Sequence, residues 1–292
     1  MPNLRMIRRR ITAVQNIQQV TRAMRMIAAS RLRRAQEGIE QTRPYADQLT
    51  EFIRHLAAQV DQESHPLLEQ REVKKATIIV IAGDRGLCRG FNANAFRKAI
   101  HRSEELAAQN IETDFIVLGK KTVDFFRRRR LPVVEAFPGI FQHLDFATAT
   151  AVARLATERF LNGETDLVEI VYNEFVSVLR QNLVTRQYLP LKATPDESEE
   201  SANEYDEYIY EPDQEYIWRA LLDKYLNFAV WRMLLESNAA EQAARMTAME
   251  EATNNAEEMI KNLISVRNKV RQTSITTELT EIVGSAESLR AD

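Results

Sequence analysis

Cysteine, proline and glycine are scarce in this 292-residue chain, and each shortage excludes a class of structure. The single cysteine, Cys88, excludes an internal disulfide and a cysteine-based metal cluster, and it fits a reducing compartment. The four histidines are scattered without metal-ligand spacing, so no metal site is expected. No window approaches about eighteen consecutive apolar residues, and the arginine-rich start lacks the apolar stretch of a secretion signal. We therefore expect a folded, soluble protein without a cofactor.

Proline and glycine are both absent from two long stretches. Between Pro212 and Gly284 a continuous helix of about seventy residues would be about 105 Å long. Residues 3–37 predict a second helix of about 50 Å. A globule of this chain length is only about 50 Å across, so the longer helix is expected to project from it and to need a partner. Pro44 predicts a kink or a restart, after which the helical pattern continues over residues 45–59.

Apolar residues recur at steps of three and four in both stretches. In the first they form a narrow stripe typical of a coiled-coil seam, although an ordinary core-facing helix has the same pattern. The stripe comprises Leu4, Ile7, Ile11, Val14, Ile17, Val20, Met24 and Ile27. The second pattern comprises Leu222, Leu226, Ala229, Met233, Ala240, Ala243 and Thr247. Small residues in its middle would let a facing helix approach closely. Because the two helices flank a compact insertion, we expect them to pair antiparallel.

Residues 73–190 have a different pattern, in which β-branched runs alternate with helical ones. The expected strands are 77–82, 114–118, 132–137, 166–175 and 183–189, and the expected helices are 92–109, 120–130 and 145–162. This alternation predicts a Rossmann-like β/α domain with a mostly parallel sheet covered by helices. The expected fold class is therefore mixed α+β and α/β, a long antiparallel coiled coil of the terminal helices with an inserted β/α domain. The expected segments are an N-terminal coiled-coil helix (1–59), the β/α domain (73–190), an acidic connector (191–212) and a C-terminal coiled-coil helix (213–292).

Charge is distributed unevenly behind a net charge of −3. Residues 1–36 contain nine arginines and no acidic residue. Between Lys192 and Arg219 there is no basic residue, while ten acidic residues accumulate. Each surface potential attracts only its complement, within about a Debye length. Two differently charged partners are therefore expected.

Three features could carry chemistry, and each has a simpler structural interpretation. Gly83, Gly86 and Gly90 stand between a strand and a helix, where backbone amides could cradle a phosphate. Their spacing matches neither the dinucleotide fingerprint nor the P-loop, which favours a structural turn. Cys88 lies between two arginines that could lower its pKa, but no base is designated for it, so a buried or interfacial role is favoured. The four arginines at 127–130 are expected to be a solvated helix face.

Four strings of the sequence are more specific than any of these features. They are TRAMRMIAASRLRRAQ (21–36), DRGLC (84–88), SNAAEQAARMTAMEEATNNA (237–256) and NKVRQTSITTELTEIV (268–283). In order, and over nearly the whole chain, they resemble the gamma subunit of F-type ATP synthases. The chain departs from the family pattern at Arg89, where many members have glycine, and at Asn254 and Asn255, where Asp-Asn is frequent.

The resemblance implies a central rotor shaft without catalytic groups. Such a subunit couples ion-driven rotation of a membrane ring to ATP synthesis or hydrolysis at the beta subunits, and it regulates ATPase activity and ion flow. The implied partners are the alpha and beta subunits, the epsilon subunit and the membrane c-ring. The implied location is peripheral, on the cytoplasmic face of the bacterial cell membrane, with no membrane span and no nucleic acid.

The resemblance also assigns contacts to particular residues. Those expected to meet the beta subunits are Arg22, Met24, Arg25, Arg245, Arg271, Gln272 and Thr276. Those expected to turn within an apolar bearing are Ile275, Leu279, Ile282 and Val283. Those expected to meet the membrane ring or the epsilon subunit are Glu204, Tyr205, Tyr208 and Tyr210.

The residues alone leave two other classes open. An arginine-rich coiled coil could bind nucleic acid, but residues 1–41 contain no aromatic side chain on which a base could stack. A stand-alone β/α enzyme would need acid, base or phosphate-binding groups that converge at the strand ends.

Overall fold

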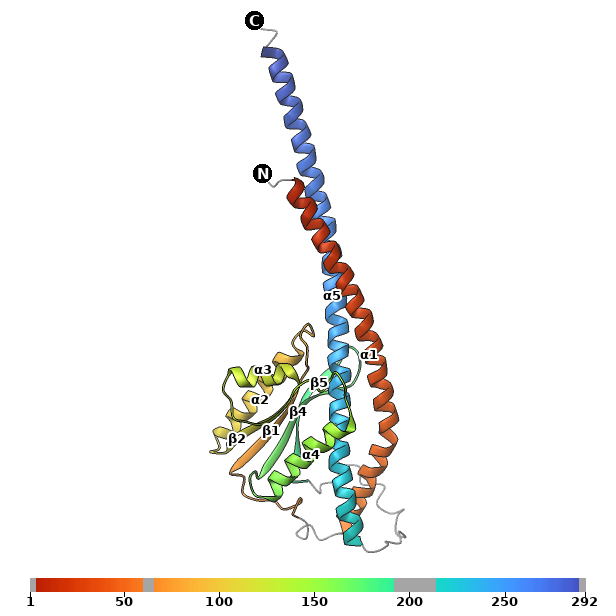
Figure 1. Cartoon of the computed structure of the whole chain (residues 1–292), viewed down its shortest axis with the longest axis vertical. Helices are drawn as coiled ribbons and strands as arrows, with labels where there is room; N and C mark the ends of the chain where they lie inside the picture. The colour runs from red at the N-terminus through yellow and green to blue at the C-terminus, as the bar shows by residue number, and fades with distance from the viewer. Residues whose placement is uncertain (1–3, 60–65, 192–213, 289–292) are drawn as a thin grey trace. The chain divides into compact units, whose positions relative to one another are not determined.

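The computed structural model describes residues 4–59, 66–191 and 214–288. Two long helices enclose a β/α sequence of elements in chain order (Figure 1). The elements are α1 (Leu4–Gln59), β1 (Lys75–Ile81), α2 (Phe91–Ala107), β2 (Glu112–Leu118), α3 (Lys120–Arg128), β3 (Val133–Phe137), α4 (Phe146–Leu161), β4 (Leu167–Phe175), β5 (Gln181–Leu189) and α5 (Gln214–Ser288). Contacts divide the chain into two compact units, and α1 and α5 contribute to both. The first unit comprises residues 1–28 and 246–292, and the second comprises residues 29–245.

The second unit contains a five-stranded sheet in the order β3-β2-β1-β4-β5. The pairs β1–β2, β1–β4 and β2–β3 are parallel, and β4–β5 is antiparallel. Successive β1 side chains point to opposite faces of the sheet, so Ile79 and Ile81 join one core while Ile78 and Val80 join the other. Burial on both faces explains why β1 reads as a continuous apolar run. The mostly parallel sheet covered by helices is confirmed.

Each face of the sheet is covered by a different set of helices. One core receives α4, the first part of α5 through Leu222, Leu226 and Val230, and the second half of α1 through Leu49 and Ile53. The other core receives α2 and α3, together with alanines of α5. The alternating pattern located these strands and helices within a few residues of their actual ends. The tertiary contacts explain the longer strands, because β1 begins at Lys75 opposite Glu112 of β2.

Helix α1 continues through Pro44, so the predicted restart of the helix at this residue is wrong. A proline inside a helix removes one backbone hydrogen bond and crowds the preceding turn. Packing of the helix after Pro44 compensates for this loss. The ring of Tyr45 lies 4.3 Å from that of Phe228 on α5, and Leu49 and Ile53 are buried in the core. Tertiary packing therefore overrides the local propensity, as it does for most helices in proteins.

In the first unit, α1 and α5 pair antiparallel. The Thr21 and Thr253 hydroxyl oxygens lie 2.8 Å apart, and the Arg25 guanidinium donates to the Glu250 carboxylate at 3.2 Å. As residue numbers rise along α1, the numbers of the contacting α5 residues therefore fall. The expected antiparallel pairing is confirmed within this unit.

The buried seam of α1 differs in phase from the apolar stripe expected from the sequence. Ile7, Ile11 and Val14 are buried as expected, but Ile17, Val20 and Ile27 are exposed, so their assignment to the seam is wrong. The residues buried along α1 instead keep close to a seven-residue repeat, namely Ile7, Ile11, Val14, Thr21, Ala28, Leu32 and Ala35. A stripe chosen by apolarity alone drifts off this repeat, because a threonine occupies the seam after Val14.

Candidate functional site

The loop between β1 and α2 is bound to the carboxyl end of the sheet by Asp84. Its carboxylate accepts hydrogen bonds from the backbone N–H groups of Lys120 at 2.7 Å, Gly139 at 2.9 Å and Phe141 at 2.8 Å. These donors follow β2 and β3, so one buried carboxylate ties together the chain segments that leave three neighbouring strands. Charge-assisted hydrogen bonds of this kind are stronger than neutral ones. The loop is therefore rigidly attached to the sheet.

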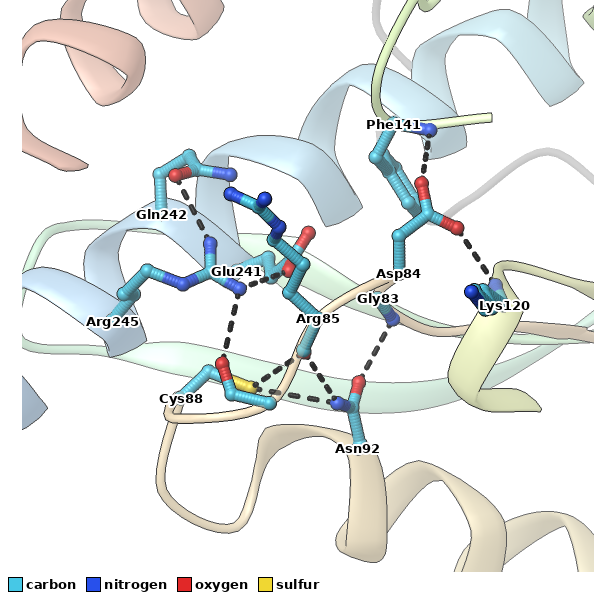
Figure 2. A network of polar contacts seen from close by, with 11 residues as sticks. Gly83, Asp84, Arg85, Cys88, Asn92, Lys120, Phe141, Glu241, Gln242 and Arg245 are labelled. Atoms are coloured by element: carbon cyan, nitrogen blue, oxygen red, sulfur yellow. Dashed lines mark hydrogen bonds and ion pairs between the residues drawn. The ribbon is translucent and has the colours of Figure 1, made fainter. Parts of the chain in front are cut away.

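A second brace comes from Asn92 in the first turn of α2. Its Oδ1 accepts from the Gly83 N–H at 2.8 Å, and its Nδ2 donates to the Arg85 carbonyl at 3.0 Å (Figure 2). Beyond this brace, Leu87 and Arg89 have positive φ angles of 63° and 51°. This left-handed region favours glycine, which explains why glycine suits the position that arginine occupies here.

Helix α5 contributes a buried ion pair to the same loop. Glu241 and Arg245 lie one turn apart, and the guanidinium donates to the Glu241 carboxylate (Figure 2). The guanidinium also donates to Gln242 Oε1 at 3.1 Å and to the Gly86 carbonyl at 3.5 Å. The carboxylate lies against Gly83, because a Cβ added at Gly83 would come within 2.6 Å of Glu241 Oε1. The loop and the helix are thus joined by charge and by close fit.

Burial governs the protonation of this cluster. Burial raises the pKa of the Glu241 carboxyl, while the neighbouring Arg245 guanidinium acts in the opposite direction. Burial, and secondly the charge of Glu241, raise the pKa of the Cys88 thiol above its ordinary value. Activated cysteines have a lowered pKa and partial exposure, so Cys88 has the properties of a structural thiol.

The same cluster occupies the place where sheets of this kind bind ligands. Open α/β sheets bind ligands beyond the carboxyl ends of the strands, where the strand order reverses. In this sheet the order reverses between β1 and β4, and the loop after β1 is the segment that receives Glu241 and Arg245. The N–H of Gly83 is already bonded to Asn92. The crevice is therefore filled by side chains of α5.

The residues expected to meet the beta subunits fall into two environments. Arg245 is buried by the chain's own residues in the second unit. The other six belong to the first unit, where Met24 and Arg25 are half-buried and the rest are exposed, namely Arg22, Arg271, Gln272 and Thr276. The residues of the expected membrane-ring or epsilon contact lie outside the described residues, namely Glu204, Tyr205, Tyr208 and Tyr210. All of these contact assignments stay predictions.

The first unit exposes many apolar side chains outside its buried seam. The four residues expected to form the bearing are between 49% and 62% exposed, namely Ile275, Leu279, Ile282 and Val283. Further exposed apolar side chains on the two helices are Met6, Ile17, Val20, Met26, Ile27, Met259 and Val266. The outer face of a soluble helix pair is normally polar and charged. An outward apolar surface of this kind indicates contact with other protein or membrane surfaces.

Asp84, Asn92 and Glu241 were not predicted from the sequence to be parts of a site. One signal was present, because Glu241 and Arg245 have the spacing and order of a helical ion pair within a run of alanines. That Glu241 meets Gly83, far away in the sequence, depends on the fold. Within the described part of the chain, no three His, Cys, Asp or Glu side chains are grouped so that they could hold a metal ion. No helix of the same residues is long and apolar enough to cross a membrane.

Comparison with known proteins places these features in a family. A family model described as ATP synthase matches residues 3–289. The ATP synthase gamma chains of Chlorobaculum parvum and Chlorobium limicola are 49% and 47% identical to this chain, and each match covers 99% of this chain and all of the relative.

Solved structures agree with the fold. A chain from the Euglena gracilis mitochondrial ATP synthase (OSCP, F1 and c-ring) has a TM-score of 0.70 at 20% identity, covering 99% of this chain and 95% of that chain. A chain from the central stalk and c-ring of the Tetrahymena thermophila mitochondrial ATP synthase has a TM-score of 0.59 at 24% identity, and the match covers 80% of this chain and 99% of that chain. With a family model over nearly its whole length and relatives close to half identical, the chain belongs to the ATP synthase gamma chain family.

Proposed function

We propose that this chain is the central rotor shaft of an F-type ATP synthase. It couples rotation of the membrane c-ring to conformational change at the beta subunits, and thereby to ATP synthesis or hydrolysis. Its partners are the alpha and beta subunits, the epsilon subunit and the c-ring, and it regulates ATPase activity and ion flow through them. Membership of the gamma chain family supports this function over a nucleic-acid-binding coiled coil or a stand-alone enzyme.

The outward apolar surface of the first unit is the observation that carries the proposal. Two paired helices that leave Ile275, Leu279 and Ile282 exposed gain stability when a surrounding protein covers these side chains. Exposed cations of the same unit, such as Arg22 and Arg271, would meet acidic groups of the beta subunits. Exposed ion pairs are worth only about 0–1 kcal/mol, so they attract successive partners without locking the rotor.

The mechanism requires different contacts with different states of the catalytic sites. A partner shifts a conformational equilibrium only as far as it binds the states unequally. We propose that one side of the helix pair favours an open, weakly binding beta subunit as it turns past. Rotation then drives release of product, and the same coupling runs in reverse during hydrolysis.

We propose that the chain itself is not catalytic and that it is peripheral, on the cytoplasmic face of the bacterial cell membrane. The filled crevice beside Gly83 supports the first point, since α5 side chains lie where a substrate would otherwise bind. We also propose that the chain is organised as an N-terminal coiled-coil helix (1–59), a β/α domain (73–190), an acidic connector (191–212) and a C-terminal coiled-coil helix (213–292).

The test compares a truncation with a point substitution in the assembled complex. Deleting the residues after Val266 removes Ile275, Leu279 and the rest of the bearing, so it should abolish most ATP-driven proton pumping. The variant C88A should pump nearly as well as the wild type, because Cys88 has the properties of a structural thiol. Equal losses in the two variants would contradict the proposal. So would co-purification experiments in which the chain fails to elute with alpha and beta subunits, or in which it hydrolyses ATP alone.

A further inference from the structure

The first part of helix α5 packs large apolar side chains such as Leu222, Leu226 and Val230 into one core, and the part that follows presents two further kinds of surface to the β/α sheet. Alanines form the first kind, and Ala240 and Ala244 belong to the core that includes α2 and α3. Small side chains allow close approach, but neighbouring ridges of alanine have nearly the same shape. Over this part of α5, the alanine surface therefore holds the helix near the sheet without strongly selecting one rotation about the helix axis.

The second kind of surface is the Glu241–Arg245 pair, and it is specific for one setting. Residues of an α-helix follow one another by about 100° and 1.5 Å, so a slip by one residue would carry both charged groups away from the loop. The ion pair itself would move with the helix, but the guanidinium would lose the Gly86 carbonyl and the carboxylate would lose its close fit beside Gly83. The ion pair contributes little net stability, but it distinguishes the observed rotation and register of α5 from those reached by a slip of one residue.

The loop that receives this pair is itself immobilised. Gly83 is held by Asn92, and the next residue, Asp84, accepts three backbone hydrogen bonds from segments that follow β2 and β3. A force applied to the Glu241 carboxylate is therefore passed to several strands of the sheet. The glycine at position 83 allows this contact, since a Cβ there would come within 2.6 Å of Glu241 Oε1.

We propose that Glu241 is a positioning residue that sets the rotation of α5 against the β/α sheet, so that turning force passes between helix and sheet without slip. The inference rests on the proposed rotor function and identifies the contact within this chain on which coupling depends. The hydrophobic cores hold helix and sheet together, while the Glu241 carboxylate packed against Gly83 defines the rotation of α5 about its own axis relative to the sheet.

The experiment uses the assembled, membrane-bound complex and measures the ratio of ATP-driven proton pumping to ATP hydrolysis. The variant G83A forces Glu241 out of its seat and should lower this ratio about 2- to 30-fold. The matched control is G86A in the same loop, because a Cβ at Gly86 meets nothing within 4 Å and alanine keeps the carbonyl that accepts from Arg245. G86A should retain the wild-type ratio.

A second substitution tests whether the effect passes through the carboxylate. Aspartate is one methylene shorter than glutamate, so E241D alone withdraws from the loop and should also lower the ratio. Combined with G83A, the shorter side chain leaves room for the added Cβ. The double variant should therefore recover a higher ratio than either single variant. If Glu241 had only a structural role, the variants would change the amount of complex that assembles. The ratio of pumping to hydrolysis in the assembled complexes would then not recover in the double variant.

Three results would overturn the inference. They are a wild-type ratio in assembled G83A, an equal loss in G86A, and a wild-type ratio in E241D, which decides the matter even where G83A does not assemble. Measurements on the wild-type complex distinguish a failure of this inference about Glu241 from a failure of the proposed rotor function. If the wild-type chain neither assembles nor supports pumping, the rotor function itself is wrong, whereas a pumping wild type with unchanged variants removes only the role of Glu241.

Discussion

Burial controls the chemistry of the single thiol, Cys88. Its side chain is buried, and both desolvation and the Glu241 charge raise its pKa. A maleimide should therefore label it at least about a hundredfold more slowly in the native chain than in denaturant, because reaction requires local opening. The matched control is L179C in a C88A background, since Leu179 is 88% exposed and should react at once. Rapid native labelling of Cys88 would contradict the buried position of the loop.

Glu236 gives a dependence of stability on pH. Burial raises the pKa of its carboxyl above the ordinary value of 4.5, while Arg232 acts in the opposite direction. The folded state therefore binds this proton more tightly than the unfolded state. The stability that this proton contributes to the folded state is fully present below about pH 4.5, and it is lost as the pH rises through the folded-state pKa.

The variant E236Q isolates this effect. The free energy of unfolding of the wild-type chain, minus that of E236Q, should decrease as the pH is raised from about 4 to 8. Urea unfolding of both chains at several pH values measures it. The exposed Glu40 supplies the control variant E40Q, which removes a carboxylate from the surface of α1. A difference that stays flat for E236Q, or that grows with pH, would show that the buried carboxyl does not titrate as described.

The pairing of α1 with α5 in the first unit depends on a polar contact inside the seam. The Thr21 and Thr253 hydroxyl oxygens lie 2.8 Å apart, and because each hydroxyl has a single proton, one donates across the seam while the other donates to a carbonyl of its own helix. Polar residues at seam positions fix the register of a coiled coil at some expense in stability. T21V and T253V should each lower the free energy of unfolding by about 1 kcal/mol, because each leaves the partner hydroxyl without this bond.

The double variant completes this test. Replacing both threonines by valine removes both polar groups together, so its loss should be smaller than the sum of the two single losses. Urea unfolding of the four chains provides the cycle. Strict additivity would mean that the two hydroxyls do not interact.

The sequence located the elements well where the pattern is local. The β-branched run of β1 and the alternation after it predicted every strand of the sheet, because a strand buried on both faces has a distinctive composition. The seam of α1 was placed less well. Apolarity alone favoured Ile17 and Val20, whereas the structure buries Thr21, since its hydroxyl finds a partner on α5. Which apolar residues of a helix lie in the seam and which lie outside it can be decided only when the partner helix is known.

The candidate site could be predicted only in part. The DRGLC string marked the loop, but nothing local in the sequence connects Gly83 with Glu241 or Asp84 with Phe141. Such contacts arise from the topology of the sheet and the path of α5, which bring distant segments together. The family resemblance supplied the partners, which no pattern of burial or charge in a single chain could have identified.

At the scale of the whole molecule, the proposed function requires the chain to rotate. The chain should turn within a stationary ring of alpha and beta subunits, because the exposed apolar side chains proposed to form the bearing, together with the exposed cations, permit turning without a fixed contact. Slip between α5 and the sheet would waste that motion, which is the role assigned to Glu241. The claim concerns the complex and does not require any reaction at a group of this chain.

Direct observation of rotation tests this claim most directly. The complex is fixed to a surface through its beta subunits, and a bead is attached to the chain at L179C, where the side chain is 88% exposed and the native thiol of Cys88 is buried. With ATP present, the bead should turn stepwise in one direction, and it should lose this turning when the residues after Val266 are deleted. ATP hydrolysis at the full rate with a stationary bead would contradict the account.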